Sequence, residues 1–122
     1  MAAYDDIPIP FLRECLSYDA ETGVLRWRAR PRGHFLDEVA HRKWNTQYPG
    51  TQAGEIKTTG YRQIEINHYG RRRVITAHRT AWALHTGEYP SGEIAHDDLD
   101  RDNNRFKNLK PMTSSERRTR FC

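Results

Sequence analysis

The last thirty residues of the chain restrict its fold more than any other part of the sequence. Two short strand-like runs, Glu93–Asp98 and Arg105–Leu109, flank a polar loop at Leu99–Asn104. A capping box follows, in which Thr113 caps a helix and the side chain of Glu116 reaches back toward it. The order of these elements predicts a strand, loop, strand and helix unit.

The preceding residues predict further helices and strands, and together with the closing unit they indicate an α+β fold. Pro10 can open a short helix before Asp19, with one apolar face. Residues 29–54 contain prolines and glycines without a clear period, and we interpret them as a long basic loop. The remaining predicted elements are strands at Val24–Arg28, Tyr61–Asn67 and Arg72–Ala77, with the last two joined as a hairpin around His68–Arg71, and a helix at His78–His85.

The length of 122 residues fits one domain and leaves no room for two independent cores. The aromatic content of 11% is typical of a folded protein rather than a disordered one. We divide the single domain, residues 1–122, into an N-terminal helix, strand and basic loop at 1–54, a hairpin with a central helix at 55–91, and the closing unit at 92–122.

No apolar run approaches the roughly 20 residues that a membrane span needs, and the N-terminus lacks the pattern of a secretion signal. We therefore expect a cytoplasmic protein with no membrane partner. Cys15 and Cys122 are too few for a thiolate zinc site, and we expect both to be reduced and uninvolved in function.

Charge is distributed unevenly along the chain. Residues 1–23 carry one base and five acids, whereas residues 24–54 carry six bases and two acids. Five acidic residues between Glu93 and Asp102 precede a largely basic C-terminal stretch. Carboxylates close to bases are what a metal-assisted nuclease needs, although an ordinary solvated surface gives the same pattern.

Three motifs, in this order, resemble the phage-type HNH endonucleases, a family that includes homing endonucleases. They are Tyr18–Trp27, which is similar to the family's opening, Ala77–Trp82, which is similar to the start of its central helix, and His96 with Asn108-Leu109 and Thr113, which are similar to its catalytic unit. The resemblance implies a ββα-metal fold for the closing unit and hydrolysis of a phosphodiester bond in DNA. For a phage-encoded protein it also implies the cytoplasm of a host cell.

The resemblance also implies roles for individual residues. His96 corresponds to the general base that takes a proton from the attacking water, and Asn108 to the residue whose side-chain carbonyl orients the imidazole. Asn103 and Asn104 correspond to the polar loop between the strands. For His78, Trp82, Thr113 and Glu116 we expect structural roles.

Two departures from the family concern the divalent metal, Mg²⁺ or Mn²⁺. The family's aspartate ligand before the general base is Ala95 here, and the second ligand position is Arg117, whose guanidinium cannot coordinate a cation. Asp97 and Asp98 are the candidate replacements. In a regular strand Asp97 would face away from His96, and Asp98 would lie about 7 Å further along the same face.

Arginines and lysines in several groups are candidates for DNA binding, because bases that neutralise phosphates give strong, salt-dependent affinity. A solvated strand face is an equally good interpretation for Arg26 and Arg28. The side chains of Gln63, Asn67 and Thr76 could reach a DNA groove from the hairpin. The basic candidates are Arg26, Arg28, Arg71, Arg72, Arg73, Arg105, Lys107, Arg117, Arg118 and Arg120.

These observations favour a protein that binds double-stranded DNA and whose cutting is impaired because the two ligand positions hold Ala95 and Arg117. Two alternatives remain open. One is an active, metal-dependent nicking endonuclease that uses Asp98 or Asp97. The other is a non-catalytic phage inhibitor or decoy that binds a host defence complex or a nucleic-acid-processing complex.

Overall fold

The computed structural model describes residues 7–112, and the first described part is a helix followed by a small hairpin. Helix α1 (Ile9–Cys15) has Pro10 in its first turn, as predicted. The chain then forms β1 (Leu16–Tyr18) and returns antiparallel as β2 (Leu25–Trp27). The predicted helix and the strand after it are confirmed, whereas β1 was not predicted.

Residues 29–54 are not one long loop, and that prediction is wrong. They contain the short 3-10 helix η2 (Arg32–His34) and the α-helix α2 (Glu38–Gln47). Helix α2 forms because the side chain of Asp37 accepts a hydrogen bond from the Ala40 N–H at 2.8 Å and so caps the first turn. None of its residues is buried, so burial of an apolar face does not account for this helix.

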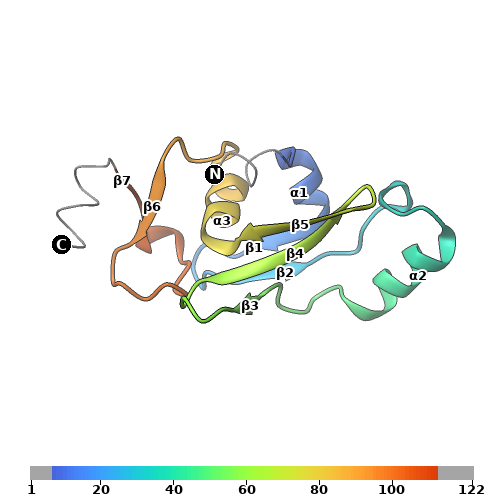
Figure 1. Cartoon of the computed structure of the whole chain (residues 1–122), viewed down its shortest axis with the longest axis horizontal. Coiled ribbons are helices and arrows are strands. Elements are labelled where there is room, and N and C mark those ends of the chain that lie inside the picture. Colours follow the sequence, from blue (N-terminus) through green and yellow to red (C-terminus); the bar gives the residue numbers. More distant parts are fainter. Residues whose placement is uncertain (1–6, 113–122) are drawn as a thin grey trace.

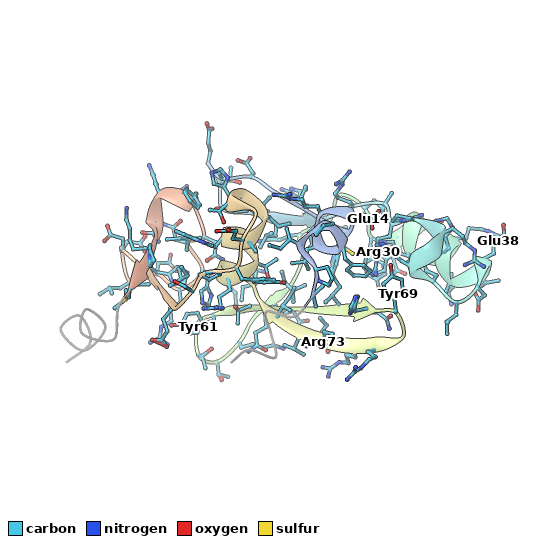
Figure 2. The ribbon with its side chains drawn as sticks, turned by 90° about the horizontal axis from the view of Figure 1, so that it is seen from above. Glu14, Arg30, Glu38, Tyr61, Tyr69 and Arg73 are labelled. Atoms are coloured by element: carbon cyan, nitrogen blue, oxygen red, sulfur yellow. The ribbon has the colours of Figure 1, made fainter. Side chains whose placement is uncertain are left out.

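The side chain of Arg30 attaches α2 to the rest of the protein. Only 2% of Arg30 is exposed. Its guanidinium donates to His34 Nδ1 at 3.0 Å and to the carbonyl of Asn67 at 2.8 Å. Figure 2 shows it between α1 and α2. The guanidinium also lies 5.0–5.4 Å from the ring centroids of Phe11, Phe35 and Trp44, within the range of a cation–π contact.

The central sheet has three antiparallel strands in the order β3, β4, β5. They are β3 (Glu55–Ile56), β4 (Arg62–His68) and β5 (Arg71–Thr76). The turn between β4 and β5 consists of Tyr69 and Gly70, both with positive φ, which matches the right-handed twist of a tight hairpin. The hairpin prediction is confirmed, whereas the two-residue edge strand β3 was not predicted.

Helix α3 (Ala77–Thr86) follows β5 directly and contacts α1, β1, β4 and β5. It ends at Gly87, whose φ of 87° and N–H bond to the Ala83 carbonyl form a left-handed cap. In Figure 1 α1 and α3 lie on the same side of the central sheet, while α2 and the β6–β7 pair lie at opposite ends of the molecule. The predicted central helix is confirmed.

The closing unit contains β6 (Glu93–His96) and β7 (Leu109–Met112), which pair antiparallel. The second strand was predicted at 105–109, and this is wrong. Residues 106–108 instead form the 3-10 helix η3 (Phe106–Asn108), closed by a hydrogen bond from the Asn108 N–H to the Arg105 carbonyl at 2.9 Å. The helix predicted from Thr113 lies outside the described residues.

One hydrophobic cluster connects the three small sheets. The cluster comprises Ile7, Phe11, Leu12, Cys15, Leu16, Leu25, Trp27, Ala53, Ile64, Ile66, Ile75, Ala77, Ala81, Ile94 and Leu109.

In residues 7–112 no helix is both long and apolar enough to pass through a lipid bilayer.

Candidate functional site

His96 is the last residue of β6, where the strand meets the polar loop of the closing unit. Its backbone pairs with Leu109 of β7, and the preceding residues Ile94 and Ala95 are buried. The β6–β7 pair therefore places the imidazole of His96 inside the protein, where 4% of the residue is exposed. A side chain at this position is restricted in orientation, because β6 and the core both hold its backbone.

The imidazole of His96 contacts the side chain of Asn104. His96 Nε2 lies 2.8 Å from Asn104 Oδ1, and Asn104 is itself 2% exposed. A carboxamide oxygen only accepts hydrogen bonds, so the ring proton of neutral His96 belongs on Nε2 and the lone pair on Nδ1. Asn104 thus fixes both the orientation and the tautomer of the imidazole.

The side chain of Asn108, predicted to orient His96, is instead placed in the polar loop. Its Oδ1 accepts from the Asp98 N–H at 3.0 Å, and its Nδ2 donates to Asp98 Oδ1 at 2.9 Å and to the Asn103 carbonyl at 2.8 Å. The 3-10 turn of η3 directs residue 108 toward this loop. Sequence reasoning placed Asn104 in the loop without a role, because three asparagines within six positions give no signal of which one reaches the imidazole.

Two aromatic rings lie beside His96. The ring centroid of His78 is 5.1 Å from that of His96 and 5.1 Å from that of Tyr61. Burial lowers the pKa of His78 to about 3, with smaller contributions from His96 and Arg79, so His78 is uncharged at neutral pH. The guanidinium of Arg101 lies 4.9 Å from the Tyr61 ring, which sits at the end of the sheet nearest the closing unit (Figure 2).

The described residues near His96 do not form a suitable set of ligands for a divalent cation. Ala95, 4% exposed and opposite Lys110 in the β6–β7 pair, has no side-chain oxygen. Within residues 7–112 there is no group of three His, Cys, Asp or Glu side chains able to hold a metal ion. Arg117, at the second expected ligand position, lies outside the described residues.

The carboxylate of Asp98 serves the polar loop. Its Oδ1 accepts from the Asp100 N–H at 2.8 Å and from Asn108 Nδ2, while its Oδ2 accepts from Asn103 Nδ2 at 2.7 Å. The hydrogen bond from Asn103 and then those from Asp100 and Asn108 lower the pKa of this exposed carboxyl. Asp97 is exposed and follows the end of β6, and its N–H donates to the Asn108 carbonyl at 2.8 Å.

One ion pair and one hydrogen bond, neither of them predicted, join the polar loop to the region of the central sheet. Arg62 on β4 donates from Nε and Nη2 to the two carboxylate oxygens of Asp102, at 2.9 and 3.2 Å. Arg101 donates to the Thr59 carbonyl at 2.6 Å. A bidentate pair of this kind fixes both side chains, so the sheet also holds the loop that carries Asn104.

The three adjacent arginines of β5 are divided between the two faces of the sheet. Arg71 and Arg73 pair with His68 and Ile66, whereas Arg72 pairs with Asn67 and alternates to the opposite face. Arg72 forms an ion pair with Glu65. The face that carries Arg72 also carries the three candidate base-reading residues Gln63, Asn67 and Thr76. The hydroxyl of Thr76 is buried, so the prediction that it reaches a DNA groove is wrong.

The other basic candidates are exposed, and three of them bind backbone carbonyls. Arg26 donates to the Gly50 carbonyl at 3.1 Å, Arg28 to the Arg13 carbonyl, and Arg105 to the Glu21 carbonyl at 3.0 Å. Each still exposes its guanidinium-bearing side chain to solvent. Lys107 is also exposed. Trp82, for which a structural role was expected, has its ring centroid 5.2 Å from that of Phe106. Outside the described residues lie Thr113, Glu116, Arg117, Arg118 and Arg120.

Comparisons with known proteins fit this geometry. Residues 76–118 match a family model described as HNH endonuclease. None of the curated proteins compared matches the chain. A similar solved structure is described as "DNA binding and cleavage by the HNH homing endonuclease I-HmuI", with 20% identity and a TM-score of 0.58 over 87% of this chain. The chain aligns with only 51% of the length of that protein, and the likeness confirms the α+β fold class.

Proposed function

We propose that the protein is a member of the HNH endonuclease family, whose model matches residues 76–118, that it binds double-stranded DNA, and that its His96 site is built to hydrolyse a phosphodiester bond. The observation that carries the proposal is the hydrogen bond between His96 Nε2 and Asn104 Oδ1, which gives the ring the orientation and tautomer of a general base.

In this proposal Nδ1 of His96 takes the proton from a water molecule that attacks the scissile phosphate. The ring then carries a positive charge, and its Nε2–H bond to Asn104 Oδ1 strengthens because a charged donor binds a carbonyl more tightly. The neighbouring His78 stays uncharged because its pKa is about 3, so it does not oppose this protonation. The two histidines thus have distinct roles set by their surroundings.

We propose that cutting by this sequence is slow. When bound in HNH endonucleases, a divalent metal supplies charge stabilisation at the phosphate, and such assistance is worth several kcal/mol. Ala95 offers no oxygen for it, and both oxygens of Asp98 already accept hydrogen bonds from the loop. The missing assistance corresponds to roughly three orders of magnitude in rate. Arg117, in our proposal, supplies a fixed positive charge to the phosphate instead.

DNA contact is proposed at the face of β4 and β5 that carries Gln63, Asn67 and Arg72. A two-stranded ribbon fits the major groove, where amide side chains can bind base edges. Asn67 and Arg72 are directly opposite each other, and Gln63 lies on the same face with the Glu65–Val74 pair between them. The exposed bases Arg26, Arg28, Arg105 and Lys107 would add contacts to phosphates.

A plasmid-nicking assay with Mg²⁺ or Mn²⁺ tests the hydrolytic part of the proposal. We expect weak nicking by the parent protein and none by His96→Ala; nicking that survives this substitution contradicts the role of His96. A salt titration of duplex binding tests the DNA part. Affinity should fall steeply between about 50 and 200 mM salt, because released counterions drive binding to phosphates. A protein that does not bind duplex DNA at low salt contradicts this part, and would favour a protein partner.

A further inference from the structure

The turn between β1 and β2, residues 19–24, and Tyr18 at the end of β1 lie outside the segment that matches the family model, yet they contact the site. We propose that this turn positions the His96 site, with Tyr18 as the positioning residue that holds Asn104 against the imidazole. The inference rests on the proposed function of His96 as a base. It assigns a role to the opening motif of the sequence, which the proposed reaction leaves without one.

The turn is held in shape by its own polar groups. The carboxylate Oδ1 of Asp19 accepts from the Glu21 N–H at 2.9 Å and from the Thr22 N–H at 3.4 Å. The backbone of Asp19 also bonds to Gly23 at 2.7 Å and to Val24 at 3.0 Å. Such hydrogen bonds are typical of an aspartate in a tight turn, and they fix the direction of the outward-facing backbone carbonyls of the turn.

Three successive residues of the closing unit bind the turn. The residues are Asn104, Arg105 and Phe106, which run from the last residue of the polar loop to the first residue of η3. The Tyr18 hydroxyl donates to the Asn104 carbonyl at 2.5 Å. Arg105 Nε donates to the Glu21 carbonyl at 3.0 Å. The Phe106 N–H donates to the Ala20 carbonyl at 3.0 Å.

Gly23 allows the turn to approach this close. A Cβ added at Gly23 would lie 2.4 Å from the Arg105 nitrogen and 2.5 Å from the carbonyl carbon of Asn104, and φ at Gly23 is +78°. Both the contact and the backbone conformation exclude a larger side chain. The glycine of the opening motif is therefore required where the turn meets the residue that contacts His96.

Asn104 is held at two points. Its backbone carbonyl accepts from Tyr18, and its side-chain Oδ1 lies 2.8 Å from His96 Nε2. Burial raises the pKa of Tyr18, so its hydroxyl keeps its proton and remains a donor across the working pH range. Loss of this donor leaves the Asn104 carbonyl without its tyrosine partner and frees Asn104 to move relative to the imidazole.

The test compares Tyr18→Phe with Tyr89→Phe. The second substitution is a matched control, because the Tyr89 hydroxyl also donates to a backbone carbonyl, that of Ile7 at 2.7 Å, in another part of the protein. Solvent exchange of the His96 Nε2 proton is measured by ¹⁵N NMR in the protein without DNA or metal. We expect Tyr18→Phe to accelerate this exchange by about tenfold and Tyr89→Phe to leave it unchanged at equal global stability.

Equal exchange rates in the two variants, or a parent His96 proton that exchanges as fast as that of free imidazole, would overturn the proposal. If Tyr18→Phe does not fold, Arg105→Gln removes the exposed bond to the Glu21 carbonyl. It should accelerate the same exchange by about threefold, because an exposed hydrogen bond contributes less, and an unchanged rate in Arg105→Gln then overturns the proposal. A Tyr18-dependent exchange rate in a protein that never nicks DNA would contradict the proposed function and leave the positioning role intact.

Discussion

The imidazole of His96 and the carboxamide of Asn104 form a 2.8 Å hydrogen bond inside the protein, between the last residue of a strand and the end of the loop that follows it. Both residues are at least 96% buried. The bond therefore exists in a medium where an unsatisfied partner is costly, and it sets which ring nitrogen of His96 can accept a proton.

Substitutions at Asn104 test whether its side-chain oxygen orients the His96 imidazole, the role that the sequence predicted for Asn108. In a background with measurable nicking, parent or Ala95→Asp, Asn104→Asp keeps an acceptor for the His96 N–H, whereas Asn104→Leu removes it. We expect Asn104→Asp to retain most of the rate and Asn104→Leu to lose about a hundredfold, because a misoriented base loses much of its catalytic effect. The measurement is the single-turnover nicking rate at saturating protein. Equal rates for the two variants would show that the acceptor has no role.

Restoring a carboxylate at position 95 should create a cation site. Ala95→Asp buries an unpaired charge, which destabilises the fold by several kcal/mol without metal. A cation at a hundredfold excess over its dissociation constant recovers about 2.7 kcal/mol. We therefore expect Mn²⁺ to raise the melting temperature of Ala95→Asp, and to leave that of the parent and of Ala95→Val unchanged. An equal shift in all three proteins would show that the cation binds elsewhere.

His78 should make the protein sensitive to acid. Its pKa is about 3 in the folded protein and near 6.5 when unfolded, so between these values the unfolded chain binds the extra proton and stability falls as pH falls. At pH 5 the loss is about 2 kcal/mol. His78→Phe should remove this part of the pH dependence of urea unfolding. His85→Gln, at an exposed histidine, should keep it; identical curves for parent and His78→Phe would contradict the assignment.

Arg30 should determine whether α2 stays attached. Arg30→Met keeps the contacts with the surrounding rings but leaves His34 Nδ1 and the Asn67 carbonyl without their donor. We expect a loss of about 2 kcal/mol or more in unfolding free energy and faster chymotrypsin cleavage near Trp44. Arg32→Lys, at an exposed neighbour, is the control and should change neither. Unaltered cleavage in Arg30→Met would mean that α2 is held by its other contacts.

The elements that the sequence predicted well are those with apolar periodicity. The β4–β5 hairpin alternates buried and exposed residues, with Ile64, Ile66 and Ile75 inside, and α3 follows with apolar residues at helical spacing. Helix α2 has no buried residue and depends on the Asp37 cap and on Arg30, a residue outside the helix. Local patterns carry no information about such a partner, so α2 could not be predicted in this way.

The same limit applies to the site. His96 was identified by its place in a motif, and the structure puts it at the end of β6. The partner of its imidazole depends on how residues 97–108 turn, and the 3-10 turn at η3 sends Asn108 into the loop and leaves Asn104 at the ring. The hydrogen bond from Tyr18 to the Asn104 carbonyl joins residues 86 positions apart, and rules based on sequence spacing do not predict contacts at that separation.

Helix α3 and the polar loop also contact the N-terminal part of the chain, through α1, β1, Tyr18 and Gly23. An excised fragment starting at residue 76 would therefore expose the apolar side of α3 and the backbone of Asn104 to water. Transplanting this segment into another protein would require moving residues 7–27 and the β4–β5 hairpin with it, so the smallest exchangeable unit is discontinuous in sequence.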